Sequence, residues 1–575
     1  MRNKELAEIF DEIAAMLSIE ETKTSRFEVR AYQTAALNIS GLQEDIEDIY
    51  RRGGMKALME LPGVGKGIAG HIEEYLKTGH IRKYDALKKK YPVDFKSLTK
   101  LEGMGAKKAM LLYRKLKIRD LADLQKAVAA HKVRELEGFG EKSEQSIANG
   151  IRLLEAAGTR MPLGDALPEA ESIVKALLGS RLVEDALVAG SARRMRETVG
   201  DIDILALSRK GEPVMDFFEK LPMVMGTVSK GPTRTTVQLK IGLTCDLRVI
   251  KPESFGAAVQ YFTGSKAHNI ATRKIAIAKG YKLNEYGLFR KNRIIASRDE
   301  REIYAKLGME WVPPEMREDR GEIKLALEHR LPKLVELADL QGDLHTHTKE
   351  TDGNNTLEEM SDAAVKAGLK YIATTNHTKS LRVARGMDEK GFAKFFEQVD
   401  RLNDKYNGSF TIMKGAEVDI LKDGSLDLER KALMSMDCVV GGVHSAFNMP
   451  EREMTKRIVT AMDSGLMHIL AHPTGRVIGV REAYPLDLAA VAEAAERNGV
   501  MLEINAYPLR LDLNDTNILE ASKYKVLFAI NSDAHNTTHF DWLRYGVGTA
   551  RRGWLENKRV TNALPLEKIM RLLQK

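Results

Sequence analysis

The sequence contains very little cysteine, since only Cys245 and Cys438 occur in 575 residues. Two cysteines argue against a disulfide framework and against a cysteine-rich zinc site. The chain has no low-complexity segment and no apolar run long enough to cross a bilayer. Its first residues, MRNKELAEIFDEIAAM, form a charged amphipathic pattern without the apolar core of a signal peptide. We therefore expect a cytoplasmic protein without a membrane partner.

The charge of the chain is unevenly distributed. The net charge is only +8 for the whole sequence. Residues 81–119, however, contain 13 Lys and Arg side chains against 3 Asp and Glu, a net charge of +10, so the rest of the chain sums to about −2. A basic block on a nearly neutral body favours a polyanionic partner such as nucleic acid. A solvated helix surface would give the same pattern, so charge alone does not decide between the two.

Length and patterning indicate several domains, because one hydrophobic core rarely grows beyond roughly 250–300 residues. The first 155 or so residues are helical in pattern. Short strands with turn glycines follow, then a turn-rich helical stretch and a charged helical segment. From Gln341 onward, apolar runs alternate with helical patterns, which predicts an α/β barrel or layered domain. The pattern changes near residues 160, 252, 316 and 341.

The pattern L-x-G-x-G occurs three times, at Leu61–Gly65, Leu101–Gly105 and Leu136–Gly140. Each copy separates two helical patterns, and glycine permits the tight turn. Free backbone N–H groups at the start of the second helix suit a phosphate and read no base. One copy could be an ordinary helical hairpin, but three copies beside the basic block resemble the helix-hairpin-helix motif of DNA repair proteins. The glycines expected at DNA are Gly63, Gly65, Gly103, Gly105, Gly138 and Gly140.

A second signal lies between Val188 and Asp203. Gly190 and Ser191 follow an apolar strand and open a helix that carries arginines, an arrangement suited to phosphate. Asp201 and Asp203 are two residues apart in a strand and so point to the same face. Together with Asp246 in TCDLRVI they offer only oxygen ligands, which favours Mg²⁺ or Mn²⁺. A single D-x-D would more often be a surface feature.

The combination of G-S-x-R-R with G-D-x-D resembles the nucleotidyltransferase signature of family X DNA polymerases. The segment Tyr261–Ser265 and the residues after it are similar to that family's nucleotide-binding thumb. The resemblance covers about residues 1–315. It implies an all-α helix-hairpin-helix N-terminal domain (1–80), fingers with two further hairpins (81–158), an α/β nucleotidyltransferase palm (159–251) and a thumb (252–315), with a linker at 316–337.

The resemblance also implies roles for individual residues. Asp201 and Asp203 would bind both catalytic Mg²⁺ or Mn²⁺ ions and Asp246 one of them. The nucleotide would be bound by a larger set: Arg160, Gly190, Ser191, Arg194, Gly200, Tyr261, Phe262, Gly264 and Asn269. Arg248 and Arg273 match positions near DNA. One departure concerns 5′-deoxyribose-phosphate lyase activity, for which the family uses a lysine after the first hairpin. His71 stands there, and a neutral imidazole forms a Schiff base poorly.

Histidines are concentrated in the C-terminal part, where eight of the 13 lie between His345 and His539. Six segments place histidine or carboxylate after an apolar run, as functional residues do at the strand ends of α/β barrels. Mixed imidazole and carboxylate ligands suit Zn²⁺, Mn²⁺ or Fe²⁺. These segments resemble the PHP (polymerase and histidinol phosphatase) domain over residues 338–575. All nine ligand positions of that family are present: His345, His347, Asp352, His377, Glu417, His444, His472, Asp533 and His535.

Nine ligands imply up to three divalent metals and an active phosphoesterase. Asn376 stands where the family usually has aspartate, and we expect it to tune the ligands rather than to bind metal. The two resemblances together indicate a bacterial or archaeal PolX enzyme, which fills gaps in gapped or primer-template DNA from dNTPs and degrades DNA 3′–5′. AP endonuclease and 3′-phosphatase activities stay open, and a monomer is expected.

Two other functions would use parts of the same pattern. A nuclease whose polymerase half only places DNA would not need the carboxylates Asp201, Asp203 and Asp246. A non-enzymatic DNA-end scaffold would need neither these nor nine metal ligands. The sequence therefore favours an enzyme with two active sites.

Overall fold

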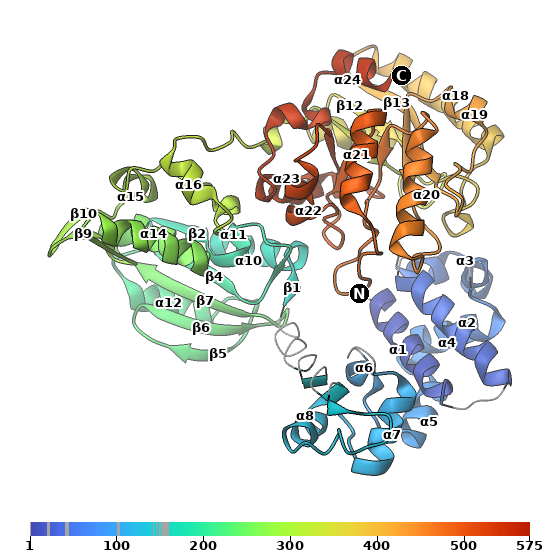
Figure 1. Cartoon of the computed structure of the whole chain (residues 1–575), viewed down its shortest axis with the longest axis horizontal. Helices are drawn as coiled ribbons and strands as arrows, with labels where there is room; N and C mark the ends of the chain where they lie inside the picture. The colour runs from blue at the N-terminus through green and yellow to red at the C-terminus, as the bar shows by residue number, and fades with distance from the viewer. Residues whose placement is uncertain are drawn as a thin grey trace. The chain divides into compact units, whose positions relative to one another are not determined.

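The computed structural model describes residues 2–19, 23–40, 45–61, 63–99, 104–141, 143–144, 147–148, 151 and 160–574 (Figure 1). The chain divides into two compact units, Met1–Thr159 with Arg382–Ala384, and Arg160–Leu381 with Arg385–Lys575. Among the described residues no helix combines the length and apolarity that a membrane span requires.

The N-terminal unit is helical, as predicted. Apolar residues at helical spacing face inward, for example Leu6, Phe10 and Ile13, which are fully buried between α1 and its neighbours. The helices are α1 (Arg2–Leu17), α2 (Lys23–Ser40), α3 (Ile46–Glu60), α4 (Lys66–Thr78), α5 (Arg82–Lys90), α6 (Phe95–Leu98), α7 (Ala106–Leu116) and α8 (Leu121–Ala129).

The described glycines of the three hairpins lie at helix starts or in turns, as the repeat predicts. Gly63 has a φ of 74°, and a Cβ there would lie 2.6 Å from Thr34 Cγ2, so both conformation and packing require glycine. Gly65 and Gly105 are the N-cap residues of α4 and α7. In the third hairpin Gly138 has a φ of 84°, and helical residues begin just after Gly140. Gly103, also predicted at DNA, lies outside the described residues.

The palm is a five-stranded sheet in the order β2-β4-β7-β6-β5. Alternation along β7 buries Cys245, Leu247 and Val249 against α10 and α12 and turns Asp246 and Arg248 to the other face. β1 and β3 form a separate short antiparallel pair. The elements are β1 (Met161–Pro162), α10 (Leu163–Gly179), β2 (Asp185–Val188), α11 (Gly190–Arg193), β3 (Thr198–Val199), β4 (Ile202–Leu207), α12 (Gly211–Glu219), β5 (Val224–Lys230), β6 (Arg234–Leu239) and β7 (Thr244–Ile250).

The thumb has its own apolar core. It contains α13 (Phe255–Thr263), α14 (Lys266–Ala278), the antiparallel strands β8 (Tyr281–Asn284), β9 (Gly287–Arg290) and β10 (Arg293–Ala296), and α15 (Glu300–Lys306). The segment 316–337, which the sequence suggested as a linker, folds onto this core. Its Met316, Ala326 and Leu334 are buried there. Ala326 belongs to α16 (Glu322–Leu327).

The C-terminal domain is a barrel of seven parallel strands in sequence order. A parallel bridge between Thr346 and Ala534 brings the last strand beside the first, so the sheet nearly closes. The strands are β11 (Gly342–Thr346), β12 (Tyr371–Thr374), β13 (Thr411–Asp419), β14 (Cys438–Gly442), β15 (Ile469–Leu470), β16 (Met501–Asn505) and β17 (Phe528–Asn531). The helices are α17 (Leu357–Lys366), α18 (Glu389–Tyr406), α19 (Arg430–Leu433), α20 (Glu451–Asp463), α21 (Leu488–Asn498), α22 (Asp515–Ala521), α23 (Leu543–Arg552) and α24 (Leu566–Leu573).

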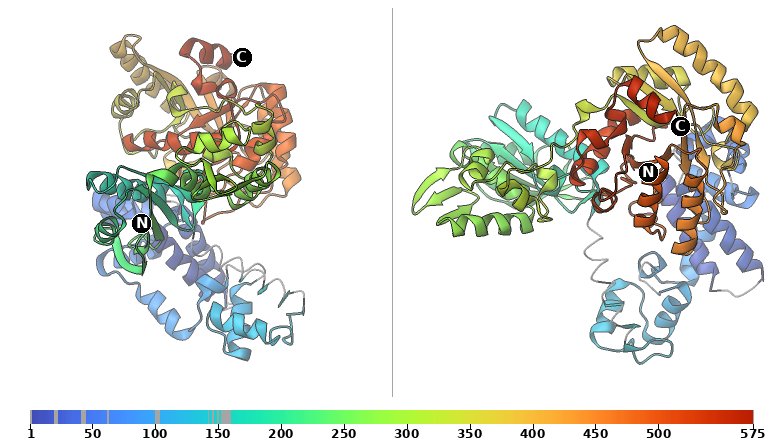
Figure 2. Two further views of the ribbon diagram at one scale, coloured as in Figure 1. Left: turned by 90° about the vertical axis from the view of Figure 1, so that its left-hand side faces the viewer. Right: turned by 45° about the horizontal axis from the view of Figure 1, so that its top comes forward.

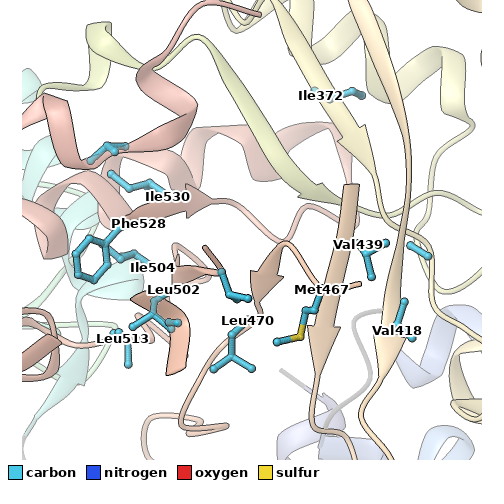
Figure 3. Packing of buried hydrophobic residues seen from close by; sticks show 14 of the residues in the cluster. Ile372, Val418, Val439, Met467, Leu470, Leu502, Ile504, Leu513, Phe528 and Ile530 are labelled. Carbon is cyan, nitrogen blue, oxygen red and sulfur yellow. The ribbon is translucent and has the colours of Figure 1, made fainter. Parts of the chain in front are cut away.

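Both faces of the barrel strands are buried, as expected for a parallel sheet covered by helices. Residues such as Ile372, Val439 and Leu502 pack in the cluster under the surrounding helices (Figure 3). Their neighbours, such as Val440 and Met501, belong to a separate buried cluster that includes Ile569 and Leu573 of α24. This packing fixes the strand ends that carry the polar residues described next.

Candidate metal centres

The nine residues predicted as PHP ligands come together at the carboxyl ends of the barrel strands. Each lies on a strand end or in the loop that follows, so neighbouring parallel strands bring sequence-distant side chains to one place. The set is His345, His347, Asp352, His377, Glu417, His444, His472, Asp533 and His535.

Glu417 lies at the centre of this set. Its carboxylate is 2.9 Å from His377 Nδ1, 2.9 Å from His472 Nε2 and 3.0 Å from His444 Nε2. His345 Nε2 approaches it at 3.3 Å. One carboxylate facing four imidazoles from different strands is a geometry suited to bridging cations.

Within the described part of the chain, potential ligand atoms form three groups. The atoms of each group all lie within 4.8 Å of one another. Buried ring nitrogens such as His347 Nε2 and His345 Nε2 have no hydrogen-bond partner. An unsatisfied buried polar atom costs about 1–3 kcal/mol, a cost that a bound cation would remove. The site therefore fits divalent metals. The three groups are His347, Asp352, His377 and His535; His345, His347 and Asp533; and His377, Glu417 and His444.

The electrostatics of the site suit cations too. Burial raises the pKa of Glu417, but the surrounding histidines outweigh this effect and hold the pKa well below its ordinary value. Burial, and next the neighbouring His535, lower the pKa of His347 to about 3. Burial likewise lowers the pKa of His472 to about 4. The carboxylate is thus ionised and these two imidazoles are neutral, the states in which each binds a metal.

Two carboxylates that the sequence analysis missed support the ligands from behind. Glu503 Oε1 lies 2.7 Å from His345 Nδ1, and its Oε2 accepts the His472 backbone N–H at 2.7 Å. Asp419 lies 3.2 Å from His444 Nδ1. Such partners fix the ring orientation and the tautomer of a ligand histidine. The one sequence signal for Glu503 is its position as a charged residue within the apolar strand MLEIN.

Asn376, the departure from the family pattern, points at the ligand loop. Its Oδ1 accepts hydrogen bonds from the Thr348 N–H at 2.8 Å and from Thr351 Oγ1 at 3.0 Å. Its Nδ2 donates to Thr348 Oγ1 at 2.9 Å. These bonds hold the segment between His347 and Asp352.

Arg510 is a further residue that the sequence analysis missed. Its Nε lies 3.8 Å from Asp533 Oδ2, and both Nε and Nη1 are buried without a hydrogen-bond partner. A guanidinium with unpaired donors beside a candidate ligand is available to an anion. Nothing in the local sequence AYPLRLDL distinguishes Arg510 from a surface arginine.

In the palm, Asp203 and Asp246 are neighbours in register on the parallel strands β4 and β7, and Asp201 lies just before β4. Gly190 packs directly against Asp203: a Cβ would lie 2.1 Å from Oδ2, and its φ is 59°. Glycine is therefore required at this place, which joins the G-S and D-x-D signals in space.

The palm carboxylates repel one another. Burial, and next the charges of Asp201 and Asp246, raise the pKa of Asp203 to about 7. Asp246 is 2.7 Å from Arg234 Nη2 and accepts a hydrogen bond from Thr236 Oγ1. Among the described residues, Asp201, Asp203 and Asp246 do not form a group whose potential ligand atoms all lie within 4.8 Å of one another. A divalent cation would offset the repulsion.

The remaining nucleotide-binding predictions fall around this triad. Ser191 follows Gly190 on α11. Arg160 donates from Nε to Thr198 Oγ1 at 3.0 Å, and a Cβ on Gly200 would lie 3.4 Å from its Nη1.

Arg194 is buried, with Nε 3.1 Å from Glu318 Oε1 and Nη1 donating to the Thr263 carbonyl at 2.5 Å. Arg194 is thus committed to protein partners.

The predicted thumb residues also contact one another. The Tyr261 and Phe262 rings meet edge to face at 5.0 Å, and the Arg248 guanidinium lies 4.4 Å from the Phe262 ring centre. Asn269 donates from Nδ2 to the Tyr261 carbonyl at 2.7 Å. Arg273 donates to the Asn269 carbonyl at 3.2 Å. A Cβ on Gly264 would lie 3.2 Å from Arg194 Nη1.

Four family models match the chain. They are a helix-hairpin-helix domain over residues 1–81, a SAM-like helix-hairpin-helix tandem over 95–152, a DNA polymerase beta thumb over 258–318 and a PHP domain over 343–507. A solved Leishmania infantum polymerase beta, described as a ternary P/T complex, aligns with 39% of this chain and 97% of its own at 21% identity. Its TM-score is 0.27, too low to establish a shared fold.

Curated relatives match on two scales. The PHP part is 31% identical over 167 residues to a probable phosphatase of Syntrophotalea carbinolica, which is 28% of this chain and 64% of that protein. The whole chain is 35% identical over 579 residues to the DNA polymerase/3'-5' exonuclease PolX of Bacillus subtilis, covering 100% of both. Since this similarity spans every domain and agrees with the matched hairpin, thumb and PHP models, the chain belongs to the PolX family, the family X DNA polymerases that carry a PHP domain.

Proposed function

We propose that the enzyme fills short gaps in damaged DNA from dNTPs and trims DNA 3′ ends, with one site for each reaction. The observation that supports the proposal is the presence of two separate clusters in one chain, acidic side chains around Asp203 and imidazole and carboxylate side chains around Glu417. The PolX relative is named for both activities. A cytoplasmic location and a monomeric state stay predictions.

In the polymerase site, Asp201, Asp203 and Asp246 would hold Mg²⁺ or Mn²⁺. Cations bound there would lower the charge barrier of an in-line nucleotidyl transfer. Ser191 and the N–H groups that open α11 would contact the triphosphate. Arg194 would join them after leaving its present carboxylate partner, and Asn269 holds the Tyr261 segment that faces the nucleotide.

In the PHP site, the nine residues around Glu417 would hold up to three Mn²⁺, Zn²⁺ or Fe²⁺ ions. Such ions supply an acidic water and offset the negative charge that develops on a phosphodiester. Arg510 would contact a non-bridging oxygen of that phosphate with its unpaired donors. Glu503 and Asp419 would keep His345 and His444 in the orientation that presents Nε2 to the cation.

A 3′-phosphatase is the second candidate activity for this site. The observation that favours it is that PHP relatives matching 28% of the chain are named probable phosphatases. Both reactions require the same cations, and in both the leaving group is a 3′ oxygen of the remaining strand. They differ in whether water attacks the phosphorus of a phosphodiester, which releases a nucleotide, or that of a terminal 3′-phosphate, which releases inorganic phosphate. AP endonuclease activity would use the same site.

Separating the two sites by mutation tests the proposal. Asp203→Ala should abolish primer extension and leave 3′ degradation largely intact. Asp533→Ala, or His345→Ala with His347→Ala, should do the reverse. Gapped, 3′-phosphorylated and abasic substrates assayed with the same proteins, in Mn²⁺ and Mg²⁺, identify the preferred PHP substrate. Wild-type extension by the Asp203→Ala protein, or undiminished degradation by the double histidine variant, would remove the respective site assignment.

A further inference from the structure

Helix α23 of the PHP domain packs against the palm turn that is proposed to bind the triphosphate (Figures 1 and 2). A Cβ on Gly548 would lie 2.6 Å from Met195 Cε, so the helix backbone touches the residue that follows Arg194. Tyr545 is buried within the palm core cluster, and Arg544 Nη1 lies 2.9 Å from Glu171 of α10. Glycine at position 548 permits this close approach.

Arg552, the last residue of α23, reaches the junction of palm and thumb. Its Nη1 donates to the Arg194 carbonyl at 2.8 Å and to Glu318 Oε1 at 3.0 Å. Its Nη2 donates to Asp515 Oδ2 at 2.5 Å. The side chain is only 5% exposed. Arg552 thus links the PHP domain to both the backbone and the charge partner of Arg194.

Glu318 is shared between two guanidinium groups. The same Oε1 atom that accepts from Arg552 also accepts from Arg194 Nε at 3.1 Å. The Glu318 side chain is 10% exposed. Burial raises the pKa of Glu318, but Arg194 and Arg552 favour the charged form more strongly, so the pKa lies below its ordinary value. The carboxylate is therefore ionised and depends on these two cations.

Glu318 occupies Arg194 Nε and the Thr263 carbonyl occupies Nη1, so the guanidinium must leave Glu318 before it can present Nε to a triphosphate. Exchanging this carboxylate for phosphate oxygens would leave a nearly buried negative charge without its partner, which is costly unless another cation stays in place. Arg552 is that cation. Arg196 approaches Glu318 as well, but at 3.6 Å and with 41% of its side chain exposed, so solvent screens its contribution.

We propose that Arg552 is a positioning residue for nucleotide binding in the polymerase site, although it belongs to the PHP domain. By neutralising Glu318 and holding the Arg194 carbonyl, it lets the Arg194 guanidinium move from Glu318 to an incoming triphosphate. Without Arg552, Arg194 becomes the principal partner of Glu318 and is withheld from the nucleotide. This inference rests on the proposed role of Arg194 as a triphosphate contact.

The test is steady-state single-nucleotide gap filling by the full-length Arg552→Gln protein. We expect the KM for dNTP to rise on the order of tenfold, within the range of coupling between sites, while kcat changes little and 3′ degradation stays unchanged. Arg551→Gln is the matched control. Arg551 is the preceding residue of the same helix and serves the same interface, but it pairs with Glu315 at 2.7 Å rather than with Glu318. Its removal should leave the KM unchanged.

A second variant separates positioning from mere loss of packing. In Glu318→Gln with Arg552→Gln, the neutral amide no longer retains Arg194, so the KM for dNTP should return toward the wild-type value. An unchanged KM in Arg552→Gln, or no recovery in the double variant, would overturn the inference. Arg194→Gln tests separately whether Arg194 contacts the triphosphate. If this variant leaves the KM for dNTP unchanged, the proposed role of Arg194 itself fails. If it raises the KM while Arg552→Gln does not, only the positioning role fails.

Discussion

His345 and Glu503 form a fully buried pair in which the Nδ1 atom of the imidazole lies 2.7 Å from Oε1 of the carboxylate. The pair fixes the tautomer in which Nδ1–H donates and Nε2 is free for a cation. Glu503→Gln keeps an acceptor but removes the charge that makes His345 a stronger ligand. We expect metal affinity and 3′–5′ degradation to fall by about 10–100-fold, with primer extension unaffected.

Metal titration of the apoprotein, monitored by elemental analysis, measures the Glu503 effect directly. Glu482→Gln is the control, because Glu482 is an exposed carboxylate of the same domain. Equal metal affinity in the two variants would show that Glu503 has no part in holding His345.

Arg510→Gln should impair catalysis without emptying the site. The side chain is 3.8 Å from Asp533 and donates no hydrogen bond to it, so metal content should persist. Loss of a donor to the reacting phosphate typically costs about 10²–10³ in rate. We expect kcat/KM on 3′-ended DNA to fall accordingly. Arg497→Gln, which removes an exposed arginine on α21 paired with Asp463, is the control. A drop in metal content equal to the drop in activity would argue for a structural role instead.

Asn376→Asp should alter the PHP activity several-fold without abolishing it. Aspartate keeps the acceptor for the Thr348 N–H but loses the Nδ2 donor and adds a negative charge behind the ligand loop. The added charge should tighten cation binding, and slower product release would then lower turnover. Mn²⁺ titration and degradation rates measured together report both effects. Complete inactivation would mean that Asn376 contributes more than support.

Lyase activity should be weak or absent. Burial, and next the charge of Lys83, lower the pKa of His71, which cannot form a stable Schiff base in any case. Lys83 Nζ is 2.8 Å from Glu28 Oε2. Burial lowers the pKa of Lys83, but Glu28 and Tyr32 outweigh this effect, so the pKa lies above its ordinary value. A raised pKa means a smaller fraction of free amine at any given pH. Borohydride trapping on a 5′-deoxyribose-phosphate substrate tests this, and a strong adduct at Lys83 would refute it.

DNA binding by the hairpins should be independent of sequence and strongly dependent on salt, because the contacts are to phosphate. Gly65→Val and Gly105→Val are informative, since a Cβ at either position meets no atom within 4 Å and the φ angles are negative. The side chain would project from the helix start toward the phosphate and weaken affinity equally for all sequences, with little change in Tm. Affinity that stays flat between low and moderate salt would contradict phosphate contacts.

The local sequence determined the chemistry of both sites. The two-residue spacing predicted Asp201 and Asp203 on one strand; the structure places Asp203 on β4 and Asp201 just before it. The placement of His345, His377 and His472 after apolar runs follows from the way parallel strands end at one edge. Such signals are local, so the amino-acid pattern together with its resemblance to known families predicts the nine PHP residues and the all-α, palm and barrel regions.

Only the tertiary structure decided which partners complete these sites. Glu503, Arg510 and Arg552 lie far along the chain from the residues they serve, and each resembles an ordinary charged residue in its own segment. The segment 316–337, charged enough to suggest a linker, packs into the thumb core and supplies Glu318. A buried charge acquires its role from groups brought beside it by folding, and no local pattern encodes that neighbour.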